Sequence, residues 1–149
     1  MAPEVPDLTQ RPPRSPRVRL GGFVLLPRML DKGRAELGGK NGDYHYNCPL
    51  DQRFLEFIGV AADSLKAQLA AGKGDREILD WIRENSVSKP TDLEIIAWSR
   101  MQEQRVPGDV ESRNFFNELH EGADPLREDI QTWFDLLDLD DFATFGGRL

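Results

Sequence analysis

The sequence has one cysteine, two histidines and no long hydrophobic run. A single cysteine excludes a disulfide framework within the chain and any zinc site built from several cysteines. The longest uninterrupted apolar run, such as residues 23–26, has four residues, whereas a transmembrane helix needs ~20. The first residues are rich in proline and arginine, without the apolar segment of a secretory signal. We therefore expect a cytoplasmic protein with no membrane span, no bound metal and no cofactor.

Charge, in contrast, is plentiful and unevenly spread. The 149 residues carry 26 acidic and 19 basic side chains, a net charge of −7. Residues 1–40 hold 8 Lys and Arg against 4 Asp and Glu, or +4, whereas residues 41–149 hold 11 against 22, or −11. The length suits one domain. The chain is thus a basic leader on an acidic body.

The leader places four arginines among prolines, a composition that favours an extended backbone with exposed charges. The arginines are Arg11, Arg14, Arg17 and Arg19. Such an arm could wrap the acidic body of its own chain, bind a protein partner or join a second copy of the chain. Arginine pairs well with carboxylates, so an acidic protein surface is an adequate target. Contact with nucleic acid is disfavoured because the negative body would repel phosphate.

From residue 23 onward the pattern is helical. Apolar residues at helical spacing, with proline, glycine and capping residues at the ends, predict helices over 23–37, 49–58, 62–72, 76–85, 91–105 and 109–121. Asp75 is the expected N-cap of the fourth, and Thr91 with Glu94 forms a capping box for the fifth. Asp124 and Pro125 predict the start of a seventh helix containing Trp133 and Leu137.

These signals predict an all-α fold. We expect a compact bundle of about seven short helices, with an extended arm over residues 1–22 and one helical domain over residues 23–149. Residues 44–47 look extended and short, so the chain has at most one tiny strand or hairpin. The tail from residue 139 has no clear period.

Reactive side chains concentrate at residues 44–51. Cys48 precedes a helix that begins at Pro49, a position that can stabilise a thiolate, so Cys48 is a candidate nucleophile. His45 or His120 would be its base, although His45 and Cys48 face opposite sides if the segment is extended. The alternative is a half-buried structural cysteine. His45, Cys48 and Asp51 are also spaced three apart, but too few ligands are in reach for a metal site.

The same segment could line a pocket together with the helix at 23–37. Its polar candidates for ligand binding are Arg28, Asp31, Lys32, Tyr44, Tyr46 and Asp51. Residues 138–141 are acidic, but Ala143 replaces the glycine that a calcium loop requires. This acidic corner could instead dock the arginine arm. One of the three tryptophans, Trp81, Trp98 or Trp133, could line a pocket, although core packing is their usual role.

Several segments resemble a small bacterial family of unknown function. They are residues 7–9, 11–16, 20–22 and 26–32, Tyr44, the Cys-Pro-Leu-Asp of residues 48–51 and the closing residues 132–138. The similarity covers residues 7–146. It implies a stand-alone bacterial cytoplasmic protein and brings no activity, cofactor or catalytic residue. It also places the Arg/Pro arm inside the domain pattern.

Two functional hypotheses follow. The first is a protein-binding or self-associating module. The alternative is a small enzyme or ligand-binding protein whose pocket is formed around residues 44–51.

Overall fold

The computed structural model describes residues 3–148, which include all but two residues of the expected arm and all but one of the expected helical domain. Over this range the chain forms seven α-helices, and the predicted all-α class is confirmed. They are α1 (Leu26–Leu37), α2 (Pro49–Ile58), α3 (Ala62–Ala70), α4 (Asp75–Asn85), α5 (Asp92–Gln104), α6 (Val110–Ala123) and α7 (Trp133–Thr144). Within these described residues, β pairing is limited to one isolated bridge between Leu20 and Phe23.

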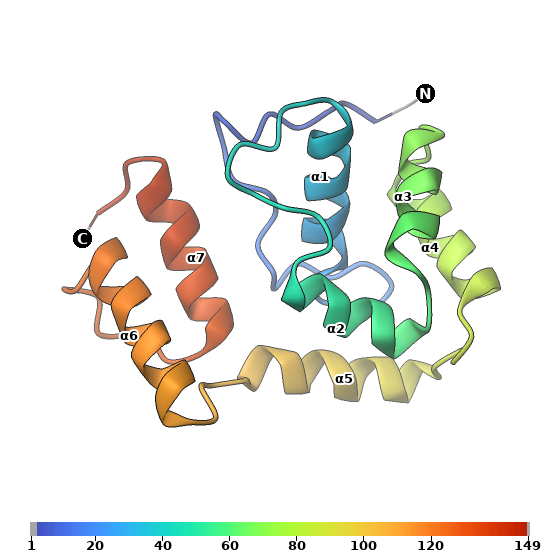
Figure 1. The fold of residues 1–149 in the computed structure, drawn as a ribbon. Coiled ribbons are helices and arrows are strands. Elements are labelled where there is room, and N and C mark those ends of the chain that lie inside the picture. Colours follow the sequence, from blue (N-terminus) through green and yellow to red (C-terminus); the bar gives the residue numbers. More distant parts are fainter. Residues whose placement is uncertain (1–2, 149) are drawn as a thin grey trace.

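The helices form two lobes, and the chain passes from one to the other at the end of α5 (Figure 1). In the main lobe, defined here as residues 3–104, α1 lies between the arm on one side and α2, α3 and α4 on the other. Helix α5 runs below α2 and leads to the α6–α7 lobe, defined as residues 105–148, where the two helices pack side by side. This arrangement places α7 across from α1 and from the loop that precedes α2.

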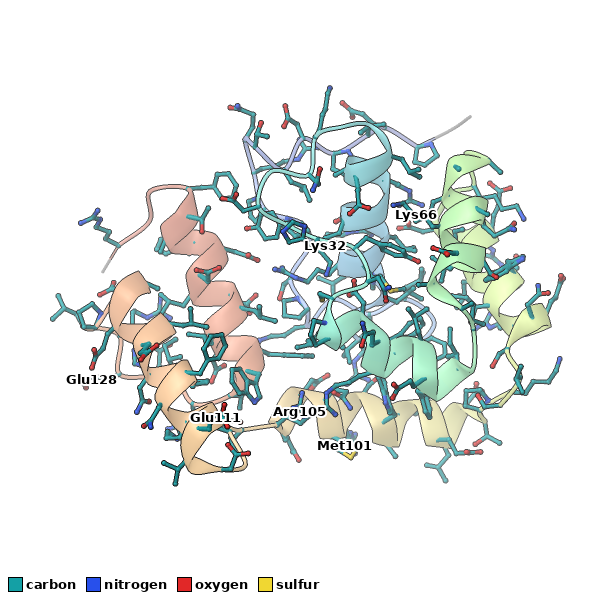
Figure 2. The ribbon with its side chains drawn as sticks, viewed as in Figure 1. Lys32, Lys66, Met101, Arg105, Glu111 and Glu128 are labelled. Atoms are coloured by element: carbon teal, nitrogen blue, oxygen red, sulfur yellow. The ribbon has the colours of Figure 1, made fainter. Side chains whose placement is uncertain are left out.

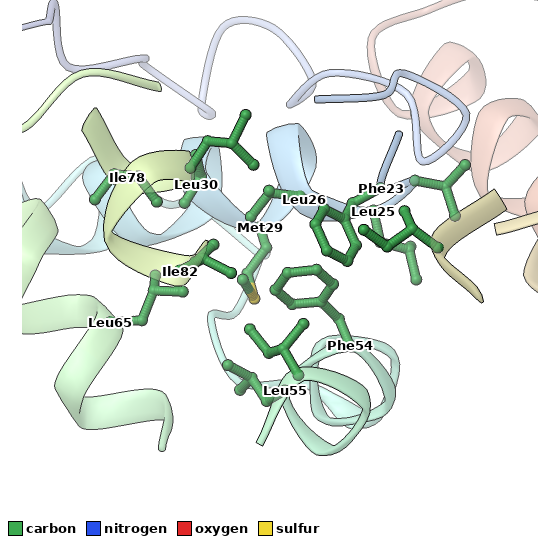
Figure 3. Close-up of a cluster of buried hydrophobic side chains, with 14 of the residues drawn as sticks. Phe23, Leu25, Leu26, Met29, Leu30, Phe54, Leu55, Leu65, Ile78 and Ile82 are labelled. Atoms are coloured by element: carbon green, nitrogen blue, oxygen red, sulfur yellow. The ribbon is translucent and has the colours of Figure 1, made fainter. Parts of the chain in front are cut away.

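The main lobe has a continuous hydrophobic core around α1 (Figure 3). Leu26, Met29 and Leu30 of α1 are completely buried, and so are Phe54 and Ile58 of α2. Each such side chain contributes roughly 1.5–3 kcal/mol relative to an exposed one. The Phe54 ring meets the rings of Phe23 and Trp98 edge to face, and Phe57 stacks on Trp98 at 4.9 Å between ring centroids.

A short turn directs the chain into α1. The Ser99 hydroxyl of α5 donates to the Gly22 carbonyl at 2.7 Å and accepts from the Val24 amide at 3.2 Å. Leu25 follows with φ at +71°, a conformation that is strained for a side chain of this size. Its amide donates to the Pro16 carbonyl at 3.0 Å, which ties this strained residue to the arm.

The arm packs on the main lobe along most of its length. Leu8 is buried and donates its amide to the Lys40 carbonyl at 2.8 Å. Pro13 and Pro16 are buried as well, while turns at residues 8–10 and 16–17 interrupt the extended backbone. The arm is therefore part of the folded structure and supplies core contacts.

Three local predictions are wrong. Asp124 and Pro125 do not begin a helix, because the Asp124 carboxylate accepts from the Leu126 amide in a tight turn after α6. Helix α7 begins instead at Trp133, where Thr132 and Asp135 form a capping box. The helix therefore extends into the tail that showed no period.

The other two corrections concern a cap and a loop. Asp75 is the first residue of α4 and Gly74 is its N-cap, because the Asp75 carboxylate binds Arg14 and Arg34. Residues 44–47 are not an extended strand, since the chain turns at residues 46–47 and Asn47 has φ at +64°. The turn brings Cys48 back toward α1.

The α6–α7 lobe has a much smaller core of four buried side chains, Phe116, Ile130, Leu136 and Leu139. The Phe116 ring packs edge-on against Trp133, with 5.2 Å between centroids. Phe134 is the residue of α7 that joins the main core, and Leu137 packs against its edge. The α6–α7 lobe is thus attached to the main lobe by few apolar contacts.

Candidate functional site

A cavity of about 940 Å³ lies where the two lobes meet. Its floor and one side come from the main lobe: α1, the start of α2 and the cavity loop, defined as residues 42–48. The other side comes from the α6–α7 lobe and is mainly apolar, with Asp140 and Thr144 as its polar members. We call its apolar part the apolar wall; it consists of Phe115, Leu119, Trp133, Leu136, Leu137 and Phe145.

One polar cluster in the cavity is centred on Lys32 of α1. Figure 2 labels Lys32 near the middle of the molecule, on the side of α1 that faces the cavity loop. Its ammonium donates to the Asp51 carboxylate at 3.0 Å and to the Cys48 sulfur at 3.2 Å. Asp51 also accepts from the Asn47 amide at 2.9 Å, so the left-handed turn at Asn47 is held in place by the same carboxylate.

A second cluster links α1 to α7. The Arg28 guanidinium donates two hydrogen bonds to Asp141, at 2.7 and 3.1 Å, and both side chains are buried. The Tyr44 hydroxyl donates to the same carboxylate at 2.9 Å, and the Arg28 guanidinium lies 5.6 Å from the Tyr44 ring centroid. Asp141 therefore joins three elements, α1, the cavity loop and α7.

The pKa shifts in this second cluster follow from burial and the Asp141 charge. Burial opposes the charge on Arg28, but the hydrogen bonds and charge of Asp141 outweigh it and raise the Arg28 pKa. Burial, with the nearby Asp141 carboxylate, raises the pKa of the Tyr44 hydroxyl. On the next residue of α7, burial and the Asp141 charge raise the pKa of Asp140, with Arg28 acting in the opposite direction.

The structure brings together most, but not all, of the residues predicted for a pocket. Arg28, Lys32, Tyr44, His45, Cys48 and Asp51 all line the cavity. Asp31 lies outside it and binds Arg14, and Tyr46 is buried on the other side of the loop, where its hydroxyl donates to the Ala62 carbonyl at 2.7 Å. Burial, reinforced by the Asp51 charge, raises the Tyr46 pKa.

The contacts do not support the predicted role of a histidine as the general base for Cys48. His120 is not at the cavity; its Nε2 atom lies 2.7 Å from the Arg127 carbonyl. His45 lines the cavity, but Lys32 is the group bonded to the Cys48 sulfur among the described side chains. An ammonium donates protons and is not a base. No group of three or more metal-binding side chains occurs within residues 3–148.

Three of the four arm arginines bind carboxylates of the same chain. Arg14 pairs with Asp31 and Asp75 at 3.0 and 2.8 Å. Arg17 pairs with Asp135 and Asp138, so the arm contacts the acidic face of α7 of its own chain, one of the alternatives that the charge pattern left open. Arg19 pairs with Glu103 of α5. Arg11 is exposed and lies close enough to Asp7 to help lower that carboxyl's pKa, after the stronger hydrogen bonds from Thr9.

The apolar wall was missed by sequence reasoning. Of its members, only Trp133 was considered as a pocket residue, and it does line the cavity. The sequence carried half of the signal, since Phe115 and Leu119 are four apart on α6; the structure adds that both remain exposed, at 55% and 42%. Large apolar side chains that share a helix face and stay exposed often mark a binding surface.

A second hollow, of about 510 Å³, follows α2 into the turn before α3. Glu56 is the one charged side chain among the described residues that line it. It lacks the combination of apolar surface and converging polar groups found in the larger cavity.

No helix within the described residues has the length and apolar character to cross a membrane.

Comparisons with known proteins give a family and nothing more specific. No curated protein matches the sequence. A family model described as "Domain of unknown function (DUF5069)" matches residues 10–143, which confirms the resemblance noted in the sequence. Residues 10–22 of the arm, the cavity loop and most of α7 fall inside that match, and the chain therefore belongs to the DUF5069 family.

Proposed function

We propose that this protein binds a small, mainly apolar molecule in the cavity between its two lobes. The observation that supports this most directly is the composition of the cavity: an apolar wall on one side faces a small set of oriented polar groups on the other. Its volume of about 940 Å³ suits a small-molecule ligand, for which sites of roughly 300–1,000 Å³ are usual.

The polar side of the cavity supports the same proposal. Lys32, Asp51 and Cys48 are held by mutual hydrogen bonds, and Arg28, Tyr44 and Asp141 form a second fixed set. Groups that are held in place before a ligand arrives lose little conformational entropy on binding. Leu25, at the cavity edge, has a strained backbone, a feature that clusters at functional sites.

The test uses the neutral dye N-phenyl-1-naphthylamine, whose fluorescence rises in an apolar site. We expect saturable binding to the native protein and about fivefold weaker binding to Phe115→Asn, because a half-buried phenylalanine contributes roughly 1 kcal/mol to an apolar contact. Leu93→Asn is the matched control, since Leu93 is 76% exposed on α5 and does not line the cavity. Absence of saturable binding, or equal weakening in both variants, would contradict the proposal.

Binding to a protein partner or to a second copy is the second proposal. The observation that favours it is the exposure of Val110, Phe115 and Leu119 along α6. Arm binding in trans would require Arg14, Arg17 and Arg19 to exchange their present carboxylate partners for new ones. Sedimentation velocity over a hundredfold dilution tests self-association: a dimer that Phe115→Asn dissociates supports it, and a monomer throughout contradicts binding to a second copy.

A cytoplasmic location, a bacterial source and a role for Cys48 as a nucleophile stay predictions from the sequence. The cavity proposal depends on none of them.

A further inference from the structure

The charged side chains that line the cavity do not balance one another. Two are cations, Arg28 and Lys32, and three are carboxylates, Asp43, Asp51 and Asp140. A cavity with two buried cations invites the expectation of an anionic ligand. The contacts within the structure lead to the opposite conclusion.

Both cations are already neutralised. Asp141 binds Arg28 through two hydrogen bonds from just behind the cavity surface, and Asp51 binds Lys32 at 3.0 Å. Arg28 and Lys32 are only 5% and 4% exposed. An anionic ligand would have to compete with these carboxylates, and separating a buried ion pair is strongly unfavourable. Neither cation is therefore available to attract an anion.

The charges that remain uncompensated are negative. Among residues 3–148, neither the Asp43 nor the Asp140 carboxylate makes a side-chain hydrogen bond or an ion pair. Asp43 belongs to the cavity loop and Asp140 to α7, so they approach the cavity from its two sides. Asp140 is exposed at the cavity, and partial burial and the Asp141 charge raise its pKa while Arg28 acts in the opposite direction; the net shift indicates that a further positive charge nearby would be favourable.

The apolar wall suits a cation for a separate reason. It contains three aromatic rings, those of Phe115, Trp133 and Phe145. Aromatic faces attract ammonium and guanidinium groups. The cavity already holds one such contact, between Arg28 and the Tyr44 ring.

We propose that the ligand is a small organic cation, an amine or quaternary ammonium on an apolar body, with its charge beside Asp140 and its body against the apolar wall. This inference rests on the proposed function, since it specifies the chemistry of the molecule that the same cavity binds. Asp43 adds to the attraction from the loop side.

The experiment compares three competitors that share one apolar body. Octylamine, 1-octanol and octanoate are titrated against bound N-phenyl-1-naphthylamine at pH 7, where the amine is protonated and octanoate is ionised. We expect octylamine to displace the dye at a concentration about fivefold lower than 1-octanol, as one partly exposed ion pair would give. Octanoate should be the weakest of the three.

Two variants locate the effect. In Asp140→Asn the preference for octylamine over 1-octanol should fall toward unity, leaving only the weaker contribution of Asp43. Glu84→Gln removes the same charge from the exposed side of α4 and should keep the preference. It controls for general attraction of cations to a chain of net charge −7.

The outcomes separate this inference from the proposed function. If 1-octanol or octanoate displaces the dye as well as octylamine, if none of the three does, or if Asp140→Asn keeps the preference, the cation inference is wrong and apolar binding stands. If the dye itself does not bind, the proposed function is wrong, and the cation inference that rests on it is wrong as well.

Discussion

The two lobes are built on different proportions of apolar and polar contact. The main lobe buries a continuous cluster that includes Phe23, Met29, Phe54 and Trp98, whereas the core of the α6–α7 lobe consists of four side chains. Helix α7 reaches the main core chiefly through Phe134. Between the lobes, hydrogen bonds and ion pairs therefore supply much of the specific attachment.

The hydrogen bonds and ion pairs between the lobes are concentrated on one face of α7. Asp135 and Asp138 bind Arg17, Ser15 also binds Asp138, and Asp141 binds Arg28 and Tyr44. Exposed ion pairs contribute little and are screened by salt, but the buried Arg28 pair is sensitive to loss of either partner. This difference implies that stability is not uniform along the chain. Local unfolding of α7 should require less free energy than local unfolding of α1, and the cavity lies between these two helices.

The largest effect should come from the main core. Phe54→Ala removes a ring that is completely buried between Phe23 and Trp98, so the free energy of unfolding should fall by about 3–5 kcal/mol. Urea denaturation followed by circular dichroism measures it. Phe142→Ala, at a ring that is 53% exposed on α7, is the control and should change little. If the two variants lost the same free energy of unfolding, the main core would not be the more important source of stability.

Next in size is the buried ion pair between the lobes. Asp141→Asn leaves the Arg28 guanidinium without its carboxylate, at a cost of about 3 kcal/mol. Because the pair joins α7 to α1, amide hydrogen exchange should speed up most in α7 and least around Met29. Asp129→Asn breaks an exposed pair with Arg127 in the same lobe and should leave exchange unchanged. Uniform acceleration throughout the chain would show that the lobes unfold as one unit.

The smallest predicted effect has the opposite sign. Because the Asp140 pKa is raised in the folded protein, its ionised form is disfavoured there, and stability is lost as pH rises through that folded value. At pH 7, Asp140→Asn should therefore stabilise the protein, by less than about 1 kcal/mol given its exposure to solvent. The gain should shrink below pH ~4, where the native carboxyl is protonated as well. Thermal denaturation at both pH values checks this, and a destabilised variant at pH 7 would refute it.

If that sign is observed, the Asp140 carboxylate destabilises the folded protein, and its role is not a structural one. A carboxylate kept in unfavourable surroundings beside an apolar cavity is expected of a binding group more than of a structural one. The prediction thus complements the competition experiment, because the same substitution should stabilise the fold and reduce the preference for a cation.

Helix positions could largely be predicted from the sequence because their signals are local. Pro49 and Gly59 bound α2, and the Thr91 capping box starts α5, within one turn of each signal. The error at Asp124 arose because an aspartate followed by proline also suits a non-helical turn. Thr132 carried an equally good cap, and only the packing of Phe134 and Leu136 decides between the two starts.

The candidate site could be predicted in part. Residues 44–51 and the polar face of α1 were identified because reactive and charged types cluster there along the chain. The apolar wall was not identified, because Phe115, Leu136 and Phe145 read individually as ordinary core or surface positions. His120 and Asp31 were placed with the site on residue type alone, and their actual partners, Arg127 and Arg14, are local or lie on the arm.

By itself the sequence determined the helical class, most helix ends and the division into a basic leader and an acidic body, since each depends on neighbours along the chain or on simple counting. Only the tertiary structure decided which charges neutralise which. Electrostatic pairing depends on distance in space, and residues as far apart as Arg28 and Asp141 meet only when α7 docks on α1. That pairing neutralises Arg28 and Lys32 and leaves the carboxylates of Asp43 and Asp140 as the unpaired charges of the cavity lining.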